Sequence, residues 1–350
     1  MKFVDCLVYT LLFTVIVACE SSYVVPDVKT KYVTAENTVA ITRDTTFCSC
    51  FSEVRSCVDV QVVCDTLLVI KDQVGNSDDC RFKIYSTSDF EYLGAIIRKG
   101  RGPGELVAPY VVKSFSSSKY LSLNDRPTGC SYMVDIQASI ASGVTVIVQR
   151  TAIPEDVIDW IPLSGTANFA LQQVGSRIAY NIIYDNGQSE SICELNESID
   201  ANRHVTIMSS VCVNDVSTQK SAVVMMFFPQ INIVDIKSGK IRSVAVGKDI
   251  RKFDLILNQR LTPHTKQYYI DAISTKSHII ATYKNLPLNK LNDVNVGTEI
   301  HVFDWTGRFV LNIIVAENIA EITFDEKNKY LYGIDSSNGD IVRYDLKALI

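Results

Sequence analysis

The sequence predicts an all-β fold, a six-bladed β-propeller. Three observations predict it. Short runs with a period of two, rich in Val, Ile, Tyr and Phe, recur along the chain. Clusters of turn-forming residues separate these runs, and no stretch keeps a helical period for three turns. A pair of such strands returns six times, which is typical of a propeller built from repeated blades.

In each copy an apolar strand is followed by a turn and by a second strand that ends in an acidic or polar residue. The expected pairs are residues 65–71 with 81–86, 120–124 with 132–135, 177–184 with 191–194, 222–228 with 231–235, 278–283 with 300–304, and 330–335 with 341–345. The residues that end the second strands are 41 to 69 positions apart, and a blade of four short strands needs about 40–50 residues. The longer intervals therefore require inserted loops. The third copy is the weakest, since no clear outer strand follows Glu194.

The ends of the chain indicate how the ring closes. The sequence stops shortly after the sixth pair, so the last blade lacks its outermost strand. Residues 38–43 read as a strand with no local partner, and we expect them to complete the last blade, because closure removes an exposed sheet edge. A pair of β-sandwiches or a β-solenoid would have the same strand content.

The N-terminus carries a targeting signal. Lys2 precedes an apolar run over residues 6–17, which is too short for a membrane span but fits a secretory signal peptide. The run ends in Ile-Val-Ala-Cys at residues 16–19, which resembles the lipobox of bacterial lipoproteins. The resemblance implies cleavage before Cys19 and attachment of lipid to its thiol. The alternative is an ordinary signal peptide that happens to contain a cysteine.

This reading divides the chain into three parts. Residues 1–18 are expected to be a lipoprotein signal peptide, residues 19–31 a polar tether, and residues 32–350 the propeller domain. The formal charge of −5 and the lack of a Lys/Arg run argue against a nucleic-acid partner. The expected location is the cell envelope at the outer membrane, and the sequence leaves open on which side of it the domain lies.

The segment Gly-Arg-Gly-Pro-Gly-Glu-Leu at residues 100–106 stands out between the first two copies. Its glycines and its proline specify a tight, irregular loop, in which free N–H groups can form an anion site or simply a structural turn. Together with the lipobox and the terminal Ile-Val-Arg-Tyr-Asp-Leu strand, this loop resembles the TolB-like six-bladed β-propeller lipoproteins of gut anaerobes. The resemblance implies the fold and the lipid anchor but no reaction.

Sequence signatures of catalysis are missing. The chain has no nucleophile elbow, Walker A loop, zinc-protease motif or dinucleotide fingerprint. Neither a catalytic residue, a metal ligand nor a cofactor is therefore assigned. Six-bladed lactonases and related hydrolases hold a metal in the central channel, so a lactonase- or lyase-type enzyme remains the alternative. A disulfide from Cys48 or Cys50 to the first blade is also possible, but its connectivity cannot be derived from the sequence.

The leading hypothesis is a lipid-anchored binding or scaffold module of the envelope, more plausibly a binder than an enzyme. Its partners would be the membrane, through Cys19, and a protein or small molecule at one face of the propeller. The loop at 100–106 and the long loop at 285–297 are predicted to emerge on the same face, so the candidate contacts are Arg101, Glu105 and Lys290. For the long loop, capping of its own blade is an equally good interpretation.

Overall fold

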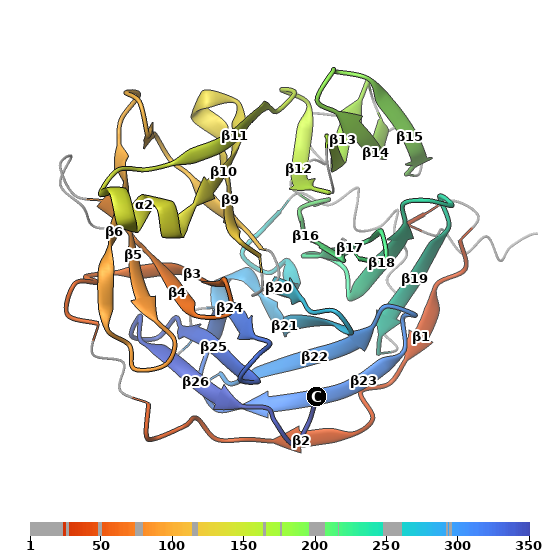
Figure 1. Ribbon diagram of the computed structural model, residues 1–350. Helices are drawn as coiled ribbons and strands as arrows, with labels where there is room; N and C mark the ends of the chain where they lie inside the picture. Colours follow the sequence, from red (N-terminus) through yellow and green to blue (C-terminus); the bar gives the residue numbers. More distant parts are fainter. Residues whose placement is uncertain are drawn as a thin grey trace, which may run out of the picture.

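Six antiparallel sheets stand around a common centre as the blades of a propeller (Figure 1), which confirms the predicted six-bladed fold. The computed structural model describes residues 24–25, 28–47, 51–73, 80–113, 118–163, 166–175, 177–195, 207–215, 217–247, 261–291, 293 and 296–350. Cys19, Cys48 and Cys50 lie outside these residues. No helix in the described ranges is long and apolar enough to cross a membrane.

The first three blades follow the chain from the innermost strand outwards. Blade 1 contains β3 (Cys57–Val63), β4 (Leu67–Asp72), β5 (Cys80–Ser86), β6 (Tyr92–Lys99) and β7 (Glu105–Leu106). Blade 2 contains β8 (Tyr110–Val112), β9 (Tyr120–Asp125), the 3-10 turn η1 (Arg126–Thr128), β10 (Cys130–Asp135), helix α2 (Ile136–Ser142) and β11 (Ile147–Ala152). Blade 3 contains β12 (Val157–Pro162), β13 (Ala167–Val174), β14 (Arg177–Tyr184) and β15 (Ser189–Glu194).

The other three blades complete the ring. Blade 4 contains β16 (Ser210–Asp215), β17 (Lys220–Met225), β18 (Gln230–Asp235) and β19 (Ile241–Val246). Blade 5 contains β20 (Lys266–Ser274), β21 (His278–Pro287), the 3-10 turn η2 (Leu288–Lys290), β22 (Thr298–Asp304) and β23 (Phe309–Val315). Blade 6 contains β24 (Ile319–Asp325), β25 (Tyr330–Asp335) and β26 (Ile341–Asp345). Two short N-terminal strands, β1 (Lys31–Val33) and β2 (Thr38–Ala40), lie at the outside.

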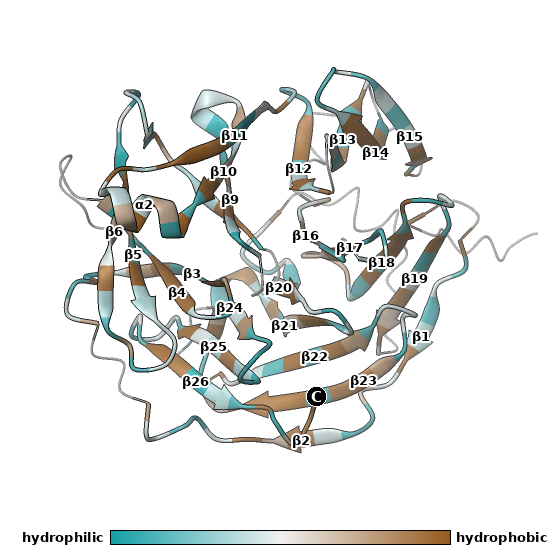
Figure 2. Cartoon of the chain, viewed as in Figure 1, coloured by the Kyte–Doolittle hydropathy of each residue, from teal (hydrophilic) through white to brown (hydrophobic). Residues whose placement is uncertain are grey.

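The core lies between the blades, because each sheet is covered on both faces by its neighbours. The inner and middle strands are therefore almost continuously apolar and buried, as in β4 and in β17. Figure 2 shows the same division, with hydrophobic strands and mostly hydrophilic turns. Outer strands such as β15 are largely exposed and polar.

The structure corrects the expected phase of the third repeat. In the other five copies the predicted pair forms the second and third strands of a blade, whereas residues 177–184 and 191–194 belong to β14 and β15, the third and fourth strands. The third strand of blade 3 thus ends at Tyr184 instead of Glu194. Measured at the ends of the third strands (Ser86, Asp135, Tyr184 and Asp235), the first three intervals are 49, 49 and 51 residues. The first four blades are therefore more regular than the sequence indicated.

The N-terminal segment forms a belt over residues 28–47 around blades 4 to 6. β1 pairs in parallel with β19 of blade 4, and β2 pairs in parallel with β23 of blade 5. The prediction that residues 38–43 complete the last blade was wrong, since the described sheet of blade 6 contains β24, β25 and β26 alone. In the part of the chain that the structure describes, this blade has three strands, as expected.

The belt covers the outer edge of blade 6 with side chains. The backbone N–H of Asp44 donates to the carbonyl of Arg343 in β26 at 2.7 Å, and the two side chains form an ion pair, also at 2.7 Å. A hydrogen bond from Thr46 and the pairing with Arg343 lower the pKa of Asp44 to about 2, so the carboxylate is ionised at any pH above this. The guanidinium of Arg343 also lies 5.0 Å from the ring centre of Phe47. An ion pair and an aromatic contact thus take the place of the predicted strand.

The folded body includes residues within the stretch that was predicted as a tether. Val24 and Val25 are only 4% and 1% exposed and belong to a core cluster formed mainly by blades 3 and 4. The tether boundary at residue 31 remains a prediction. The buried valines nevertheless attach the chain to the propeller four positions after Glu20.

Candidate functional site

The residues nearest the propeller axis come from the innermost strands β3, β8, β12, β16, β20 and β24. Four of these strands carry an acidic residue at a β-bulge, where the pairing with the second strand shifts register. The residues are Asp59 in β3, Asp159 in β12, Asp271 in β20 and Glu321 in β24. A bulge re-aims side chains, and here it brings carboxylates to the inner edge of four sheets.

Three of these carboxylates connect neighbouring blades. Oδ2 of Asp59 accepts from the backbone N–H of Val111 at 3.4 Å, and Oδ2 of Asp271 accepts from that of Ile322 at 2.8 Å. Oδ2 of Asp159 accepts from the backbone N–H of Cys212 at 3.0 Å. These contacts join blade 1 to 2, blade 5 to 6 and blade 3 to 4. The acidic residues are therefore part of how the ring is held together.

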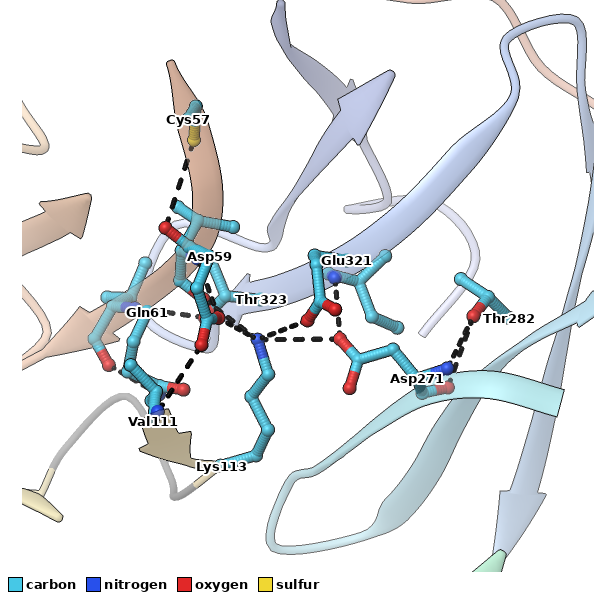
Figure 3. A network of polar contacts seen from close by, with 12 residues as sticks. Cys57, Asp59, Gln61, Val111, Lys113, Asp271, Thr282, Glu321 and Thr323 are labelled. Carbon is cyan, nitrogen blue, oxygen red and sulfur yellow. Dashed lines mark hydrogen bonds and ion pairs between the residues drawn. The ribbon is translucent and has the colours of Figure 1, made fainter. Parts of the chain in front are cut away.

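Lys113, which directly follows β8, lies at the centre of this arrangement (Figure 3). Its Nζ is 2.7 Å from Oδ1 of Asp59, 3.2 Å from Oε2 of Glu321 and 3.4 Å from Oδ2 of Asp271, and its side chain is 5% exposed. Blades 2 and 5 stand opposite each other in a six-bladed ring, so the contact between Lys113 and Asp271 spans the axis. We call Lys113, Asp59, Asp271 and Glu321 the axial cluster.

The electrostatics of the axial cluster follow from burial and charge. Burial alone would lower the pKa of Lys113, but Asp271, Asp59 and Glu321 outweigh it and raise this pKa well above its ordinary value. Burial and the adjacent Asp271 raise the pKa of Glu321, although 31% of its side chain still reaches solvent. Burial also raises the pKa of Asp271, against the opposing effect of Lys113. The cluster thus holds a permanent ammonium and favours a proton on its carboxyl pair.

The axial cluster does not fit a divalent cation. A metal would need the carboxylate oxygens that Lys113 already contacts, and the ammonium would repel it. Within the described ranges, no group of three or more His, Cys, Asp or Glu side chains is arranged to hold a metal ion.

The loop at residues 100–106 closes on itself. The Glu105 carboxylate accepts from the backbone N–H of Gly102 at 2.8 Å, and the N–H of Gly100 donates to the carbonyl of Leu106 at 3.2 Å. A Cβ at Gly100 would displace the Glu105 carboxylate from its position at the Gly102 N–H. Arg101 is exposed. The motif is thus a structural turn. Within the described residues, Arg101 forms no ion pair with an acidic side chain.

The long loop of blade 5 is partly packed. Leu286, Leu288 and Leu291 are half-buried, and Leu288 packs against the core cluster that contains Val24 and Val25. Lys290 is exposed at the end of η2. Leu288 therefore packs on a cluster formed mainly by blades 3 and 4, whereas the simpler interpretation expected the loop to cap its own blade.

The structure does not gather the predicted contact residues into one cluster. Arg101 and Glu105 lie between blades 1 and 2, whereas Lys290 lies in blade 5 on the other side of the ring. The two loops nevertheless emerge on the same face of the propeller. The loop at 100–106 leads into β8, the innermost strand of blade 2, and the loop at 285–297 joins the second and third strands of blade 5. Because the strands of a blade alternate in direction, both kinds of connection lie on one side. We call this side the leading face.

A cavity opens at the leading face between blades 2 and 3. It has a volume of about 430 Å³, which is within the range of small-molecule sites. Its walls come from β8, η1 and the connection from β11 to β12, and then from β12 itself. The lining residues are Tyr110, Arg126, Pro127, Thr128, Gly129, Ile153, Pro154, Glu155, Val157, Asp159 and Trp160.

Sequence reasoning missed both the axial cluster and the cavity. The sequence did contain a signal for the acidic residues. Four innermost strands share a four-residue pattern, in which the first and last positions are apolar, the second varies and the third is acidic. They are residues 57–60, 157–160, 269–272 and 319–322. Lys113 had no such signal, because its partners come from distant parts of the chain.

These features define the class of the molecule: a closed six-bladed β-propeller with an ion-paired axis and a cavity beside it. A family model described as TolB-like 6-blade propeller-like matches residues 31–327, and the chain belongs to this family. No functionally curated protein matches it.

Solved structures of similar fold come from Bacteroides. A member of the DUF4221 family from Bacteroides vulgatus has 9% identity and a TM-score of 0.55, with 83% of this chain and 92% of that one covered. A protein from Bacteroides fragilis that is named as exported has 11% identity and a TM-score of 0.52, with 85% and 88% covered. At these identities the likeness concerns the fold alone.

Proposed function

We propose that the protein is a lipid-anchored envelope module that binds its ligand at the leading face of the propeller. The observation that carries this proposal is the cavity of about 430 Å³ between blades 2 and 3. Cys19 is the proposed lipid site, at the end of the apolar N-terminal run. Arg101 and Lys290 are exposed on loops of the same face and are proposed contacts for a larger partner. Glu105 would act through the shape of its loop, because Gly102 already occupies its carboxylate.

The buried valines limit how far the domain can stand from the lipid. Five residue steps separate Cys19 from Val24, and an extended chain spans at most about 3.6 Å per step, or roughly 18 Å in all. Val24 packs into the core around blades 3 and 4. A lipid on Cys19 would therefore hold the propeller against the membrane by this side, and would leave little of the freedom that a polar tether to residue 31 would give.

The Cys19→Ser variant should no longer be anchored. Acyl chains contribute about 0.8 kcal/mol per buried CH₂, and the serine hydroxyl does not accept the thioether-linked lipid. The variant should appear in the soluble fraction of lysed cells and should not incorporate a fatty-acid analogue. Cys6→Ser, inside the signal peptide, is the matched control and should label normally. Equal labelling of the Cys19→Ser protein would contradict the anchor.

A variant with a blocked cavity tests the binding face. Pro154→Trp should fill the cavity, and Lys237→Trp places the same ring on an exposed turn of blade 4 as the control. Small-molecule fractions of the growth medium are first screened for those that raise the melting temperature of a protein of residues 20–350. These fractions should not raise the melting temperature of the Pro154→Trp variant. A ligand at about 100 times its Kd stabilises by about 2.7 kcal/mol, so the shift is measurable. A shift that persists in Pro154→Trp would place the ligand elsewhere and overturn the proposed face.

A further inference from the structure

The ligand class follows from a comparison of three equivalent carboxylates. Asp59, Asp159 and Asp271 occupy the same position in the innermost strands of alternate blades, and each accepts a backbone N–H from the next blade. Asp59 and Asp271 both have Lys113 as an ion-pair partner. Asp159 has no lysine, arginine or histidine nitrogen within ion-pair distance among the described residues, and it lines the cavity.

Among the described residues, the hydrogen-bond donors to Asp159 are neutral, and the positive charge of Arg126 acts on it from outside ion-pair distance. Oδ1 accepts from the backbone N–H of Trp160 at 2.9 Å, and Oδ2 accepts from that of Cys212 at 3.0 Å. Burial raises the pKa of Asp159. A cation that enters the cavity would supply the charge that Lys113 supplies to the other two carboxylates, and would favour the ionised form of Asp159.

The same wall also carries a positive charge. The Arg126 guanidinium donates to the carbonyl of Ile158, the residue next to Asp159, and lies 5.9 Å from the ring centre of Tyr110. The guanidinium also hydrogen-bonds the Tyr110 hydroxyl. A guanidinium has five N–H groups in a planar fork, so further ones can bind a carboxylate. The cavity is thus lined by one negative group, Asp159, and one positive group, Arg126.

The cavity also has an aromatic wall. Tyr110 is half-buried and lines the cavity together with Trp160. Trp160 is only 2% exposed, so Tyr110 provides most of the apolar ring surface that a ligand can contact.

We propose that the cavity binds a small zwitterion, an amino acid or a dipeptide, with its ammonium at Asp159 and its carboxylate at Arg126. The inference rests on the proposed function, since it names the ligand class of the same cavity. The volume of about 430 Å³ leaves room for one apolar side chain against the rings.

Titration calorimetry with alanyl-phenylalanine and residues 20–350 tests the assignment. The free dipeptide should bind, whereas N-acetyl-alanyl-phenylalanine and alanyl-phenylalanine amide, which each lack one charge, should bind at least 10-fold more weakly. In Arg126→Met the dipeptide and its amide should bind alike, while the preference for the free amino group remains. In Asp159→Asn the preference for the free amino group over the acetylated form should disappear.

A control and a second readout keep the outcomes separate. Arg150 also lies 5.9 Å from a tyrosine ring centre, that of Tyr132 in blade 2, but does not line the cavity, so Arg150→Met should bind as wild type does. If Asp159→Asn does not fold, the Arg126→Met comparison decides. Equal affinity of the dipeptide and its capped forms, or no binding of any of them, would overturn the zwitterion. If an uncharged ligand binds and Pro154→Trp prevents its binding, the zwitterion is overturned but the proposed binding face is not.

Discussion

Lys113→Met is expected to destabilise the propeller by about 3–5 kcal/mol, because it leaves buried carboxylates without their cation. Asp59, Asp271 and Glu321 all lie within 3.4 Å of the lysine nitrogen. Methionine keeps the length and the apolar stem of the side chain, so the loss reports the charge. The melting temperature should fall by on the order of 10 °C, as measured by circular dichroism or calorimetry.

The stability of this variant should depend on pH more strongly than that of the wild type, in the same direction. The pKa values of Asp271 and Glu321 are raised in the folded protein, so the folded state binds protons more tightly than the unfolded chain does. Stability therefore rises as the pH falls towards these raised values. Without Lys113 this effect should grow, and the melting temperature of Lys113→Met should increase between pH 8 and pH 5. The raised pKa of Lys113 means that the contribution of the wild-type lysine is complete below its ordinary pKa of 10.5 and is lost only in stronger alkali.

Lys237→Met is the matched control, since Lys237 is exposed on a turn of blade 4. It should change stability by no more than about 0.5 kcal/mol. If Lys113→Met melts like this control, the axial cluster contributes no net stability. The ion pairs would then act only in positioning the strands.

Deletion of residues 19–45 should destabilise the whole domain and promote aggregation. The deletion removes both parallel strands of the belt, the ion pair of Asp44 with Arg343 and the two buried valines. Burying one valine contributes about 1.5 kcal/mol or more, so the total loss should exceed about 3 kcal/mol before the strand contacts are added. It also uncovers strand edges of blades 4, 5 and 6, which favours pairing between molecules.

A shorter deletion separates the belt from the anchor. A chain that starts at Tyr23 lacks the signal peptide and Cys19 but keeps Val24, Val25 and the belt. It should melt at the same temperature as residues 20–350 and remain monomeric in light scattering. An unchanged melting temperature after deletion of 19–45 would show that the belt is dispensable.

The strand repeat could be predicted from the sequence because it depends on local pattern. Five of the six predicted pairs form the second and third strands of a blade, where both faces are buried and the apolar run is long. The phase of blade 3 could not be predicted in the same way. Its outermost strand, β15, is exposed and ends in Glu194. In the other copies an acidic or polar residue ends the third strand, so the sequence around Glu194 resembles the end of a third strand.

The blade with which the N-terminal strand pairs could not be predicted from local sequence pattern either. Residues 38–40 have the composition of a strand in any blade, and the three pairs that they form with Asn312, Ile313 and Ile314 depend on where the preceding residues are held. Val24, Val25 and β1 bind that part of the chain to blade 4 and its neighbours, so β2 reaches blade 5 and not blade 6. A simple count of strands missing from the last blade could not include this constraint.

The all-β class, the number of blades and the three strands described in the last blade could be predicted from the sequence alone. These properties follow from period-two burial and from the spacing of repeated turns, which are properties of neighbouring residues. The charged residues that meet at the axis, and the absence of an ion pair at Asp159 among the described residues, depend on how distant parts of the chain come together. Closure of the ring brings Lys113 of blade 2 to Asp59 and Asp271 and leaves Asp159 facing a cavity, because ion pairs depend on distance in space and not on separation along the chain.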